Sequence, residues 1–203
     1  MKIEKRADII RDWINEYCSK MVTGPNALVI GISGGIDSSV VSTLCAQTSR
    51  KTIVVSMPIK QIKSQHDLSL SHGEWLESKF KNVKFKIIEI DKVFNSFKST
   101  LSDFDSEHGL ANSRARLRMT TLYQIAAAES GIVVGTGNKV EDFGVGFYTK
   151  YGDGGVDISP IGDCNKSLVW DLGRHLGILK EIIEAPPTDG LWNDGRNDED
   201  QLG

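Results

Sequence analysis

Residues 27–39 have the sequence Ala27-Leu28-Val29-Ile30-Gly31-Ile32-Ser33-Gly34-Gly35-Ile36-Asp37-Ser38-Ser39. The first six residues form a short apolar run rich in β-branched residues, which is typical of a buried parallel strand. The serines and glycines that follow favour a turn, and we expect a helix over residues 37–46. Strand, turn and helix in this order predict a unit of a layered α/β fold.

The rest of the chain continues this alternation. Further strands are expected over 52–57, 83–90 and 131–136, with a fifth over 157–161. Helices are expected over 3–21, 64–80, 110–130, 165–176 and 179–184. This order predicts an α/β fold, a doubly wound and mostly parallel sheet with helices on both faces, whose ligands bind at the carboxyl ends of the strands.

The composition describes one ordinary globular domain. The chain has 203 residues, 39% hydrophobic and 25% charged, with a net charge of -3. That charge argues against binding nucleic acid through a basic surface. Cys18, Cys45 and Cys164 are widely spaced and odd in number, which favours three buried thiols in a reducing compartment. With no signal sequence and no apolar run that could span a membrane, we expect a cytoplasmic protein without a membrane partner.

The glycine-rich turn has the chemistry of a phosphate site. Small residues allow a ligand close to the backbone, and the free N–H groups at the start of the next helix favour an anion. Asp37 would suit a magnesium ion carried by the phosphates. The turn is neither a Walker A loop nor a dinucleotide-binding GxGxxG motif. The alternative is an ordinary glycine-rich turn that Asp37 caps.

This turn resembles the SGGxDS loop of the ATP pyrophosphatases, which split ATP between its α and β phosphates. Four later stretches, 112–119, 134–141, 146–160 and 185–191, resemble the NAD synthetase family in order and spacing. The resemblance runs from about residue 9 to residue 203 and implies a doubly wound, adenine nucleotide alpha hydrolase-like fold. Members of the family are homodimers whose deamido-NAD site lies at the subunit interface.

The resemblance also implies roles for individual residues. Asp37 and Lys166 would be catalytic, and Asp37 and Glu141 would bind Mg²⁺. Arg116, Lys150 and Asp157 would bind deamido-NAD. ATP would contact Gly31, Ile32, Ser33, Gly34, Gly35, Ile36, Asp37, Ser38, Thr136, Lys166 and Thr188. Chemically, Lys166 could offset charge that develops on the α-phosphate or on the leaving pyrophosphate.

The activity implied is that of a carbon–nitrogen ligase. ATP would adenylate the nicotinate carboxylate of deamido-NAD, and ammonia would displace AMP to give NAD. Glutamine-using relatives carry an additional amidase domain, for which this chain has no room, so free ammonia is the expected donor; a separate glutaminase partner stays open. We expect residues 1–203 to be a single domain that lacks the C-terminal segment with which family members usually continue.

Several other interpretations stay open. Glu141 could be an ordinary acid in a first helical turn, Lys150 and Asp157 could pair with each other, and Lys166 could lie on the surface. Arg114, Arg116 and Arg118 alternate, so they cannot share one helix face, and we expect different contacts for each. The chain could be another SGGxDS ATP pyrophosphatase, such as a tRNA-modifying ligase, or a non-catalytic nucleotide sensor on the same fold.

Overall fold

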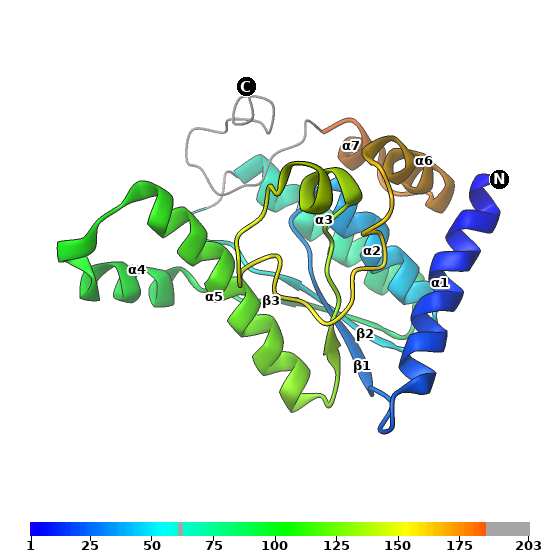
Figure 1. Ribbon diagram of the computed structural model, residues 1–203, viewed down its shortest axis with the longest axis horizontal. Coiled ribbons are helices and arrows are strands. Elements are labelled where there is room, and N and C mark those ends of the chain that lie inside the picture. The colour runs from blue at the N-terminus through cyan, green and yellow to red at the C-terminus, as the bar shows by residue number, and fades with distance from the viewer. Residues whose placement is uncertain (61–62, 186–203) are drawn as a thin grey trace.

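The computed structural model describes residues 1–60 and 63–185 (Figure 1). Within them, strands β1 (Ala27–Gly31), β2 (Lys51–Ser56), β3 (Val83–Ile87) and β4 (Ile132–Val133) form one sheet. The strand order is β3-β2-β1-β4, and every neighbouring pair is parallel. The predicted parallel sheet is therefore confirmed.

The helices follow the expected alternation, with additions. They are α1 (Ile3–Lys20), α2 (Ile36–Gln47), α3 (Lys63–Lys79), α4 (Asp91–Thr100), α5 (Glu107–Ala128), α6 (Lys166–Leu176) and α7 (Lys180–Ile183), with a 3₁₀ turn η1 (Ser102–Phe104) and a π-helical turn η2 (Val140–Val145). The sequence did not predict α4, η1 or η2. Helix α4 buries only Phe94 fully.

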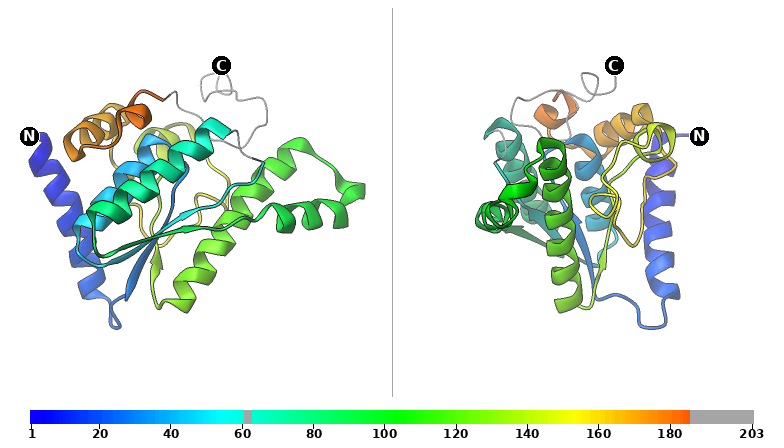
Figure 2. Two further views of the ribbon diagram at one scale, coloured as in Figure 1. Left: turned by 180° about the vertical axis from the view of Figure 1, so that it is seen from behind. Right: turned by 60° about the vertical axis from the view of Figure 1, so that its left-hand side comes forward.

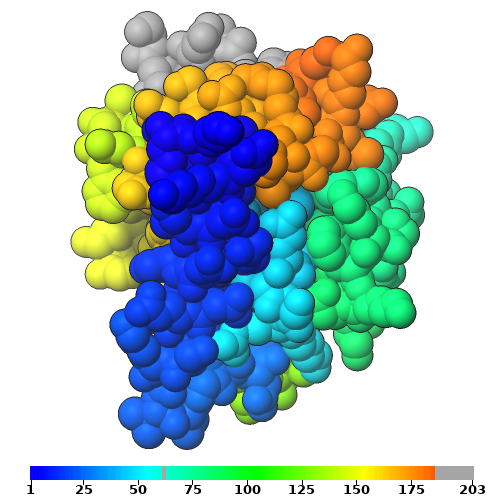
Figure 3. Space-filling model, turned by 90° about the vertical axis from the view of Figure 1, so that its right-hand side faces the viewer, coloured from blue at the N-terminus to red at the C-terminus, as the bar shows by residue number. Residues whose placement is uncertain are grey.

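Alternate residues of the strands point to opposite faces of the sheet, and the buried apolar residues of the described chain form three clusters. Leu28 and Ile30 of β1 pack in a cluster with α1, α2 and α6, whereas Ala27 and Val29 pack in a cluster with α4 and α5. Figure 2 shows α1 and α5 on opposite sides of the sheet. Figure 3 looks onto the outer face of α1, with α6 beside its N-terminal end. Helices thus cover both faces, as predicted.

The expectation of a fifth strand over residues 157–161 is wrong. This segment makes one isolated parallel bridge, between Val134 and Ile158, and then turns. Pro160 cannot donate to a strand ladder, and the N–H of Gly162 bonds to the carbonyl oxygen of Ser159 in that turn. The segment nevertheless lies against the end of β4, where the N–H of Gly135 donates to the carbonyl oxygen of Ile158 at 2.8 Å.

Two further expectations concern burial. Cys18, Cys45 and Cys164 are all free and buried, as predicted for thiols that pack as small apolar side chains. None of the helices in the described part of the chain is long and apolar enough to cross a membrane.

Candidate active site

The turn after β1 and the segment after β4 meet at the carboxyl edge of the sheet. β1 is followed by β2 and β3 on one side, whereas β4 returns to the other side of β1. Strands β1 and β4 are therefore neighbours whose connections diverge, which makes their carboxyl ends a topological switch point. Open α/β sheets bind their ligands at such points.

The turn of residues 33–35 leaves the start of α2 open. Ser38 Oγ and Ser39 Oγ donate to the carbonyl oxygen of Gly35, at 3.0 and 2.9 Å, which fixes the turn onto the helix. Gly34 has a φ of +88°, a conformation that favours glycine. No side chain caps the N-terminus of α2 at Gly35. The free N–H groups at this helix start have the chemistry of an anion site, and the phosphate site stays a prediction.

Lys166 joins two carboxylates from distant parts of the chain. Its Nζ lies 2.6 Å from Asp37 Oδ2 and 2.8 Å from Glu141 Oε1. Asp37 is in the first turn of α2, Glu141 lies in η2, and Lys166 is the first residue of α6. Their side chains are between 17% and 27% exposed, so all three are largely shielded from solvent. The interpretation of Lys166 as a surface residue is therefore wrong. Glu141 does lie in the first turn of η2, and it also pairs with Lys166.

Burial and charge act against each other in this cluster. Burial raises the pKa of Asp37 and the charge of Glu141 raises it further, while Lys166 and Asn138 favour the carboxylate. Burial lowers the pKa of Lys166, but the two carboxylates outweigh it and hold that pKa above its usual value. The lysine is therefore a fixed positive charge beside the glycine-rich turn. Burial, then Glu141, Asp153 and Asp37, raise the pKa of the neighbouring Asp142 to about 6.

Of the three residues expected to bind the dinucleotide, Arg116 and Lys150 are in contact, whereas Asp157 bonds to other partners. Arg116 Nε donates to the backbone carbonyl oxygen of Lys150 at 3.2 Å, which joins α5 to the loop of residues 146–160. Asp157 accepts bonds from Tyr123 Oη at 3.0 Å and from the N–H of Val133 at 2.7 Å. Asp157 is held by α5 and β4, and Lys150 Nζ lies over the Tyr151 ring, so the interpretation of a Lys150–Asp157 pair gains no support.

The three alternating arginines have separate surroundings, as predicted. Arg114 is buried, with its guanidinium over the Phe94 ring. Arg116 faces the loop that contains Lys150, and Arg118 Nε donates to the carbonyl oxygen of Met57 at 3.0 Å, just beyond β2. Thr136 lies half-buried after β4, at the carboxyl edge of the sheet. Thr188 lies outside the described residues.

The two expected metal-binding carboxylates could hold a cation only if substrate phosphates and water supplied its remaining ligands. Within residues 1–60 and 63–185, no group of three or more His, Cys, Asp or Glu side chains could hold a metal ion. Asp37 Oδ2 and Glu141 Oε1 do converge on one cation, the Lys166 ammonium. Magnesium commonly uses one or two carboxylates and takes its remaining ligands from substrate phosphates and water. The two carboxylates fit that arrangement.

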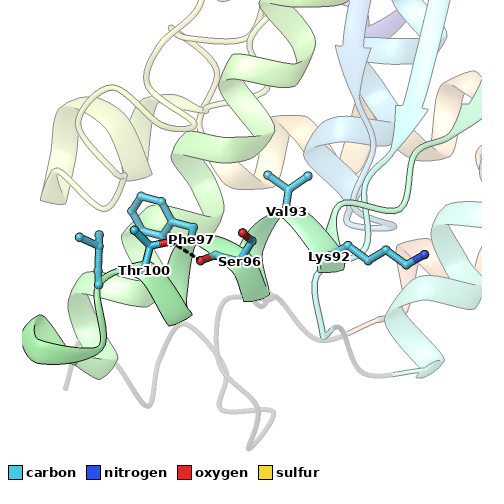
Figure 4. Close-up of a pocket in the computed structure, with 6 residues that line it drawn as sticks. Lys92, Val93, Ser96, Phe97 and Thr100 are labelled. Carbon is cyan, nitrogen blue, oxygen red and sulfur yellow. Dashed lines mark hydrogen bonds between the residues drawn. The ribbon is translucent and has the colours of Figure 1, made fainter.

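The sequence missed two residues that shape this region. Asn138 is fully buried and bonds to Asp37, and Tyr123 bonds to Asp157. Asn138 stands in the stretch 134–141 that carries the resemblance, but its residue type alone gave no sign of a carboxylate partner. The groove on α4 is a separate feature at the far end of the molecule from α6 (Figure 1). It is lined by Lys92, Val93, Ser96, Phe97, Thr100 and Leu101 (Figure 4).

Comparison with known proteins assigns the chain to a family. The model of the family described as NAD synthase matches residues 6–203. A curated protein named NH(3)-dependent NAD(+) synthetase from Methanococcoides burtonii is 39% identical over 208 residues, which cover 100% of this chain and 76% of that protein. A solved structure of NMN synthetase from Francisella tularensis has a TM-score of 0.91 and 32% identity, covering 100% of this chain and 82% of its own. An NH3-dependent NAD synthetase from Campylobacter jejuni, solved with a nitrate ion, has a TM-score of 0.81 and 32% identity, with coverages of 91% and 77%. Since the family model matches nearly the whole chain, and the curated relative is 39% identical over 76% of its own length, this chain belongs to the NAD synthase family.

Proposed function

We propose that this chain makes NAD from deamido-NAD, ATP and ammonia, releasing AMP and pyrophosphate. The observation that carries the proposal is the cluster of Asp37, Glu141 and Lys166 beside the open N-terminus of α2. That arrangement offers both charges that an ATP pyrophosphatase site needs, a fixed cation and two carboxylates. The family's curated members bear the name of this activity.

The chemistry must first convert a poor leaving group into a good one. A nicotinate oxygen attacks the α-phosphorus of ATP, the bond to the bridging oxygen breaks, and pyrophosphate leaves. Ammonia then attacks the acyl carbon of the adenylate, AMP departs with the carbon–oxygen electron pair, and the nitrogen loses a proton. The protein supplies alignment and charge for these transfers.

The residues divide this work. The open N–H groups at the start of α2 would receive the ATP phosphates. Lys166 would offset negative charge on the α-phosphate or on the departing pyrophosphate. Asp37 and Glu141 would hold Mg²⁺ together with phosphate oxygens, and the ion would then neutralise phosphate charge during the transfer. Arg116, Lys150 and Asp157 would contact the dinucleotide, and an arginine can hold its pyrophosphate or carboxylate through paired donors.

The proposal is tested by product release. The purified protein receives ATP, Mg²⁺ and ammonium, with and without deamido-NAD, and AMP, pyrophosphate and NAD are quantified. The proposal expects all three products only when deamido-NAD is present. AMP release that ignores deamido-NAD would point to another ATP pyrophosphatase, and nucleotide binding without any product would favour the sensor interpretation.

A second substrate is favoured by one comparison. The structure of NMN synthetase matches this chain with a TM-score of 0.91. The corresponding reaction would amidate nicotinate mononucleotide, which has the same carboxylate but lacks the AMP half. Supplying both acids in competition and measuring kcat/KM for each would decide between them. The homodimer and the cytoplasmic location stay predictions.

A further inference from the structure

Asn138 is fully buried and bonds both to Asp37 and to the turn that carries Glu141. Its side-chain Nδ2 donates to Asp37 Oδ1 at 3.0 Å. Its side-chain Oδ1 accepts from the N–H groups of Val140 and Glu141, at 3.0 and 3.2 Å. Both ends of the amide are therefore engaged, one with the carboxylate of α2 and the other with the turn that carries Glu141.

The hydrogen bond to Asp37 fixes the orientation of its carboxylate plane, with one oxygen held by Asn138 and the other directed into the site. Oδ1 accepts the Asn138 amide, whereas Oδ2 faces the Lys166 ammonium at 2.6 Å. Rotation of the carboxylate out of this plane, about its Cβ–Cγ bond, would break the hydrogen bond from the Asn138 amide in a buried environment, where a lost hydrogen bond is costly. Asn138 thus fixes Oδ2 toward the point that Glu141 Oε1 also faces.

The bonds to residues 140 and 141 fix the backbone from which the second carboxylate extends. A side-chain amide oxygen that accepts the N–H groups two and three residues later sets the direction of the chain in a turn. The backbone of Asn138 continues that turn, because its carbonyl oxygen accepts from the N–H of Asp142 at 3.0 Å. The next residue ties the turn to the segment before α6, since the N–H of Lys139 donates to the carbonyl oxygen of Cys164 at 2.9 Å.

We propose that Asn138 is a positioning residue that holds Asp37 and Glu141 in one arrangement, so that they bind a divalent cation together with the ATP phosphates. The proposal rests on the proposed function for its choice of ligand, ATP with a divalent cation. Asn138 itself touches neither ATP nor the dinucleotide in this role. It acts through the two carboxylates, so its loss should weaken cation binding much more than it changes binding of the dinucleotide.

Two variants separate positioning from folding. Asn138→Ala removes the donor and the acceptor. Asn138→Ser keeps an acceptor of the type that caps such turns, but its shorter side chain cannot reach Asp37. Asn82→Ala is the matched control, because Asn82 also uses its side-chain amide twice, to the carbonyl oxygens of Ala46 and Arg50, both of which lie before β2 at the opposite edge of the sheet.

The main measurement is Mn²⁺ binding by electron paramagnetic resonance in the presence of a non-hydrolysable ATP analogue, with Mg²⁺ dependence of AMP release as a second readout. For Asn138→Ser we expect Mn²⁺ binding to weaken by about tenfold or more, which corresponds to loss of a hydrogen bond to a charged group. The KM for deamido-NAD should change by less than about twofold in the same variant, since its expected contacts lie on α5 and in the loop of residues 146–160. Asn82→Ala should bind Mn²⁺ as the unaltered protein does.

The proposal is overturned if Asn138→Ser binds Mn²⁺ with unchanged affinity, or if Asn82→Ala weakens binding equally. It is also overturned if the unaltered protein binds no Mn²⁺ with the ATP analogue. These outcomes differ from failure of the proposed function, in which the unaltered protein binds Mn²⁺ and nucleotide but forms no amide product. Circular dichroism of each variant establishes that the protein compared is folded.

Discussion

Lys166 Nζ lies 2.6 Å from Asp37 Oδ2, where it occupies the side of the carboxylate that a cation would use. The same ammonium lies 2.8 Å from Glu141 Oε1. In this state, the lysine neutralises two carboxylates that would otherwise repel each other in a shielded site. Arrival of Mg²⁺ with ATP would let Asp37 and Glu141 exchange the ammonium for the ion, and Lys166 would turn to the phosphates.

Lys166→Met tests this exchange, because methionine has a similar length and no charge. We expect AMP release to fall by about 10² to 10³-fold, the range found when one group that stabilises transition-state charge is removed. Mn²⁺ binding without ATP should become tighter, since the competing ammonium is gone. Lys180→Met is the control, because Lys180 is exposed and pairs only with Glu184 among the described residues. Weaker Mn²⁺ binding in Lys166→Met would contradict the exchange.

Gly34 should tolerate no side chain. A Cβ at this position would lie 2.7 Å from the carbonyl oxygen of Gln65 and 2.9 Å from the N–H of Ser69, both backbone atoms of α3, in addition to the strain of φ +88°. Gly177→Ala is a matched control, since Gly177 has φ +71° but open space around its Cβ. We expect Gly177→Ala to cost about 1 kcal/mol in urea unfolding. Gly34→Ala should cost clearly more and should also weaken ATP binding in calorimetry.

His72 should make stability depend on pH. Its Nε2 lies 2.9 Å from Ser42 Oγ, and burial lowers its pKa to about 4. Below pH 6.5 the histidine of the unfolded chain binds a proton, whereas that of the folded chain stays neutral down to about pH 4. The free energy of unfolding should therefore fall as the pH drops from about 6.5 to 4, by at most about 3 kcal/mol. Urea unfolding at pH 7.5 and 4.5 should show a smaller difference for His72→Gln. The variant His175→Gln, at an exposed histidine, should behave as the unaltered protein does. Asp142, whose pKa is raised to about 6, is present in the unaltered protein and in both variants, so its contribution to the pH dependence is the same in all of them.

The fold was predictable because local pattern and packing agree. The apolar runs that became β1 and β2 are continuous and lie buried between helices, and the alternation of strands and helices allows few other folds. The prediction of a fifth strand was wrong because the apolar residues of 157–161 indicate burial but not strand pairing. Pairing needs backbone N–H donors, but Pro160 has none, and the N–H of Gly162 is used in a turn. Helix α4 was missed because it packs mainly through Phe94 and leaves Val93 exposed.

The sequence predicted which residues belong to the candidate site, but not the hydrogen bonds that they make with one another. The strand ends place Asp37 and Glu141 at one edge of the sheet, so their neighbourhood follows from topology. The orientation of the Asp37 carboxylate depends on Asn138, which is 101 residues away in sequence and reaches Asp37 through the packing of β4 beside β1. No spacing rule describes such a contact.

Arg116 provides the last prediction, which also concerns what the site binds. Its Nε donates to the Lys150 carbonyl oxygen, and the terminal amino groups of this exposed guanidinium are further donors that a ligand could use. We expect Arg116→Ala to raise the KM of deamido-NAD by about tenfold or more while the KM of ATP stays unchanged. Arg116→Lys should recover part of this loss, because it restores charge but not paired donors. Arg174→Ala, which removes an exposed partner of Asp171, is the control.

The same variant locates the contact when both acids are supplied. If Arg116 binds the nicotinate carboxylate, the losses with deamido-NAD and with nicotinate mononucleotide should match, because both carry that group. If it binds the pyrophosphate, only the KM of the dinucleotide should rise, because the mononucleotide has a single phosphate. An unchanged KM for both acids would remove Arg116 from the substrate site and leave its bond to the Lys150 carbonyl oxygen as a purely structural contact.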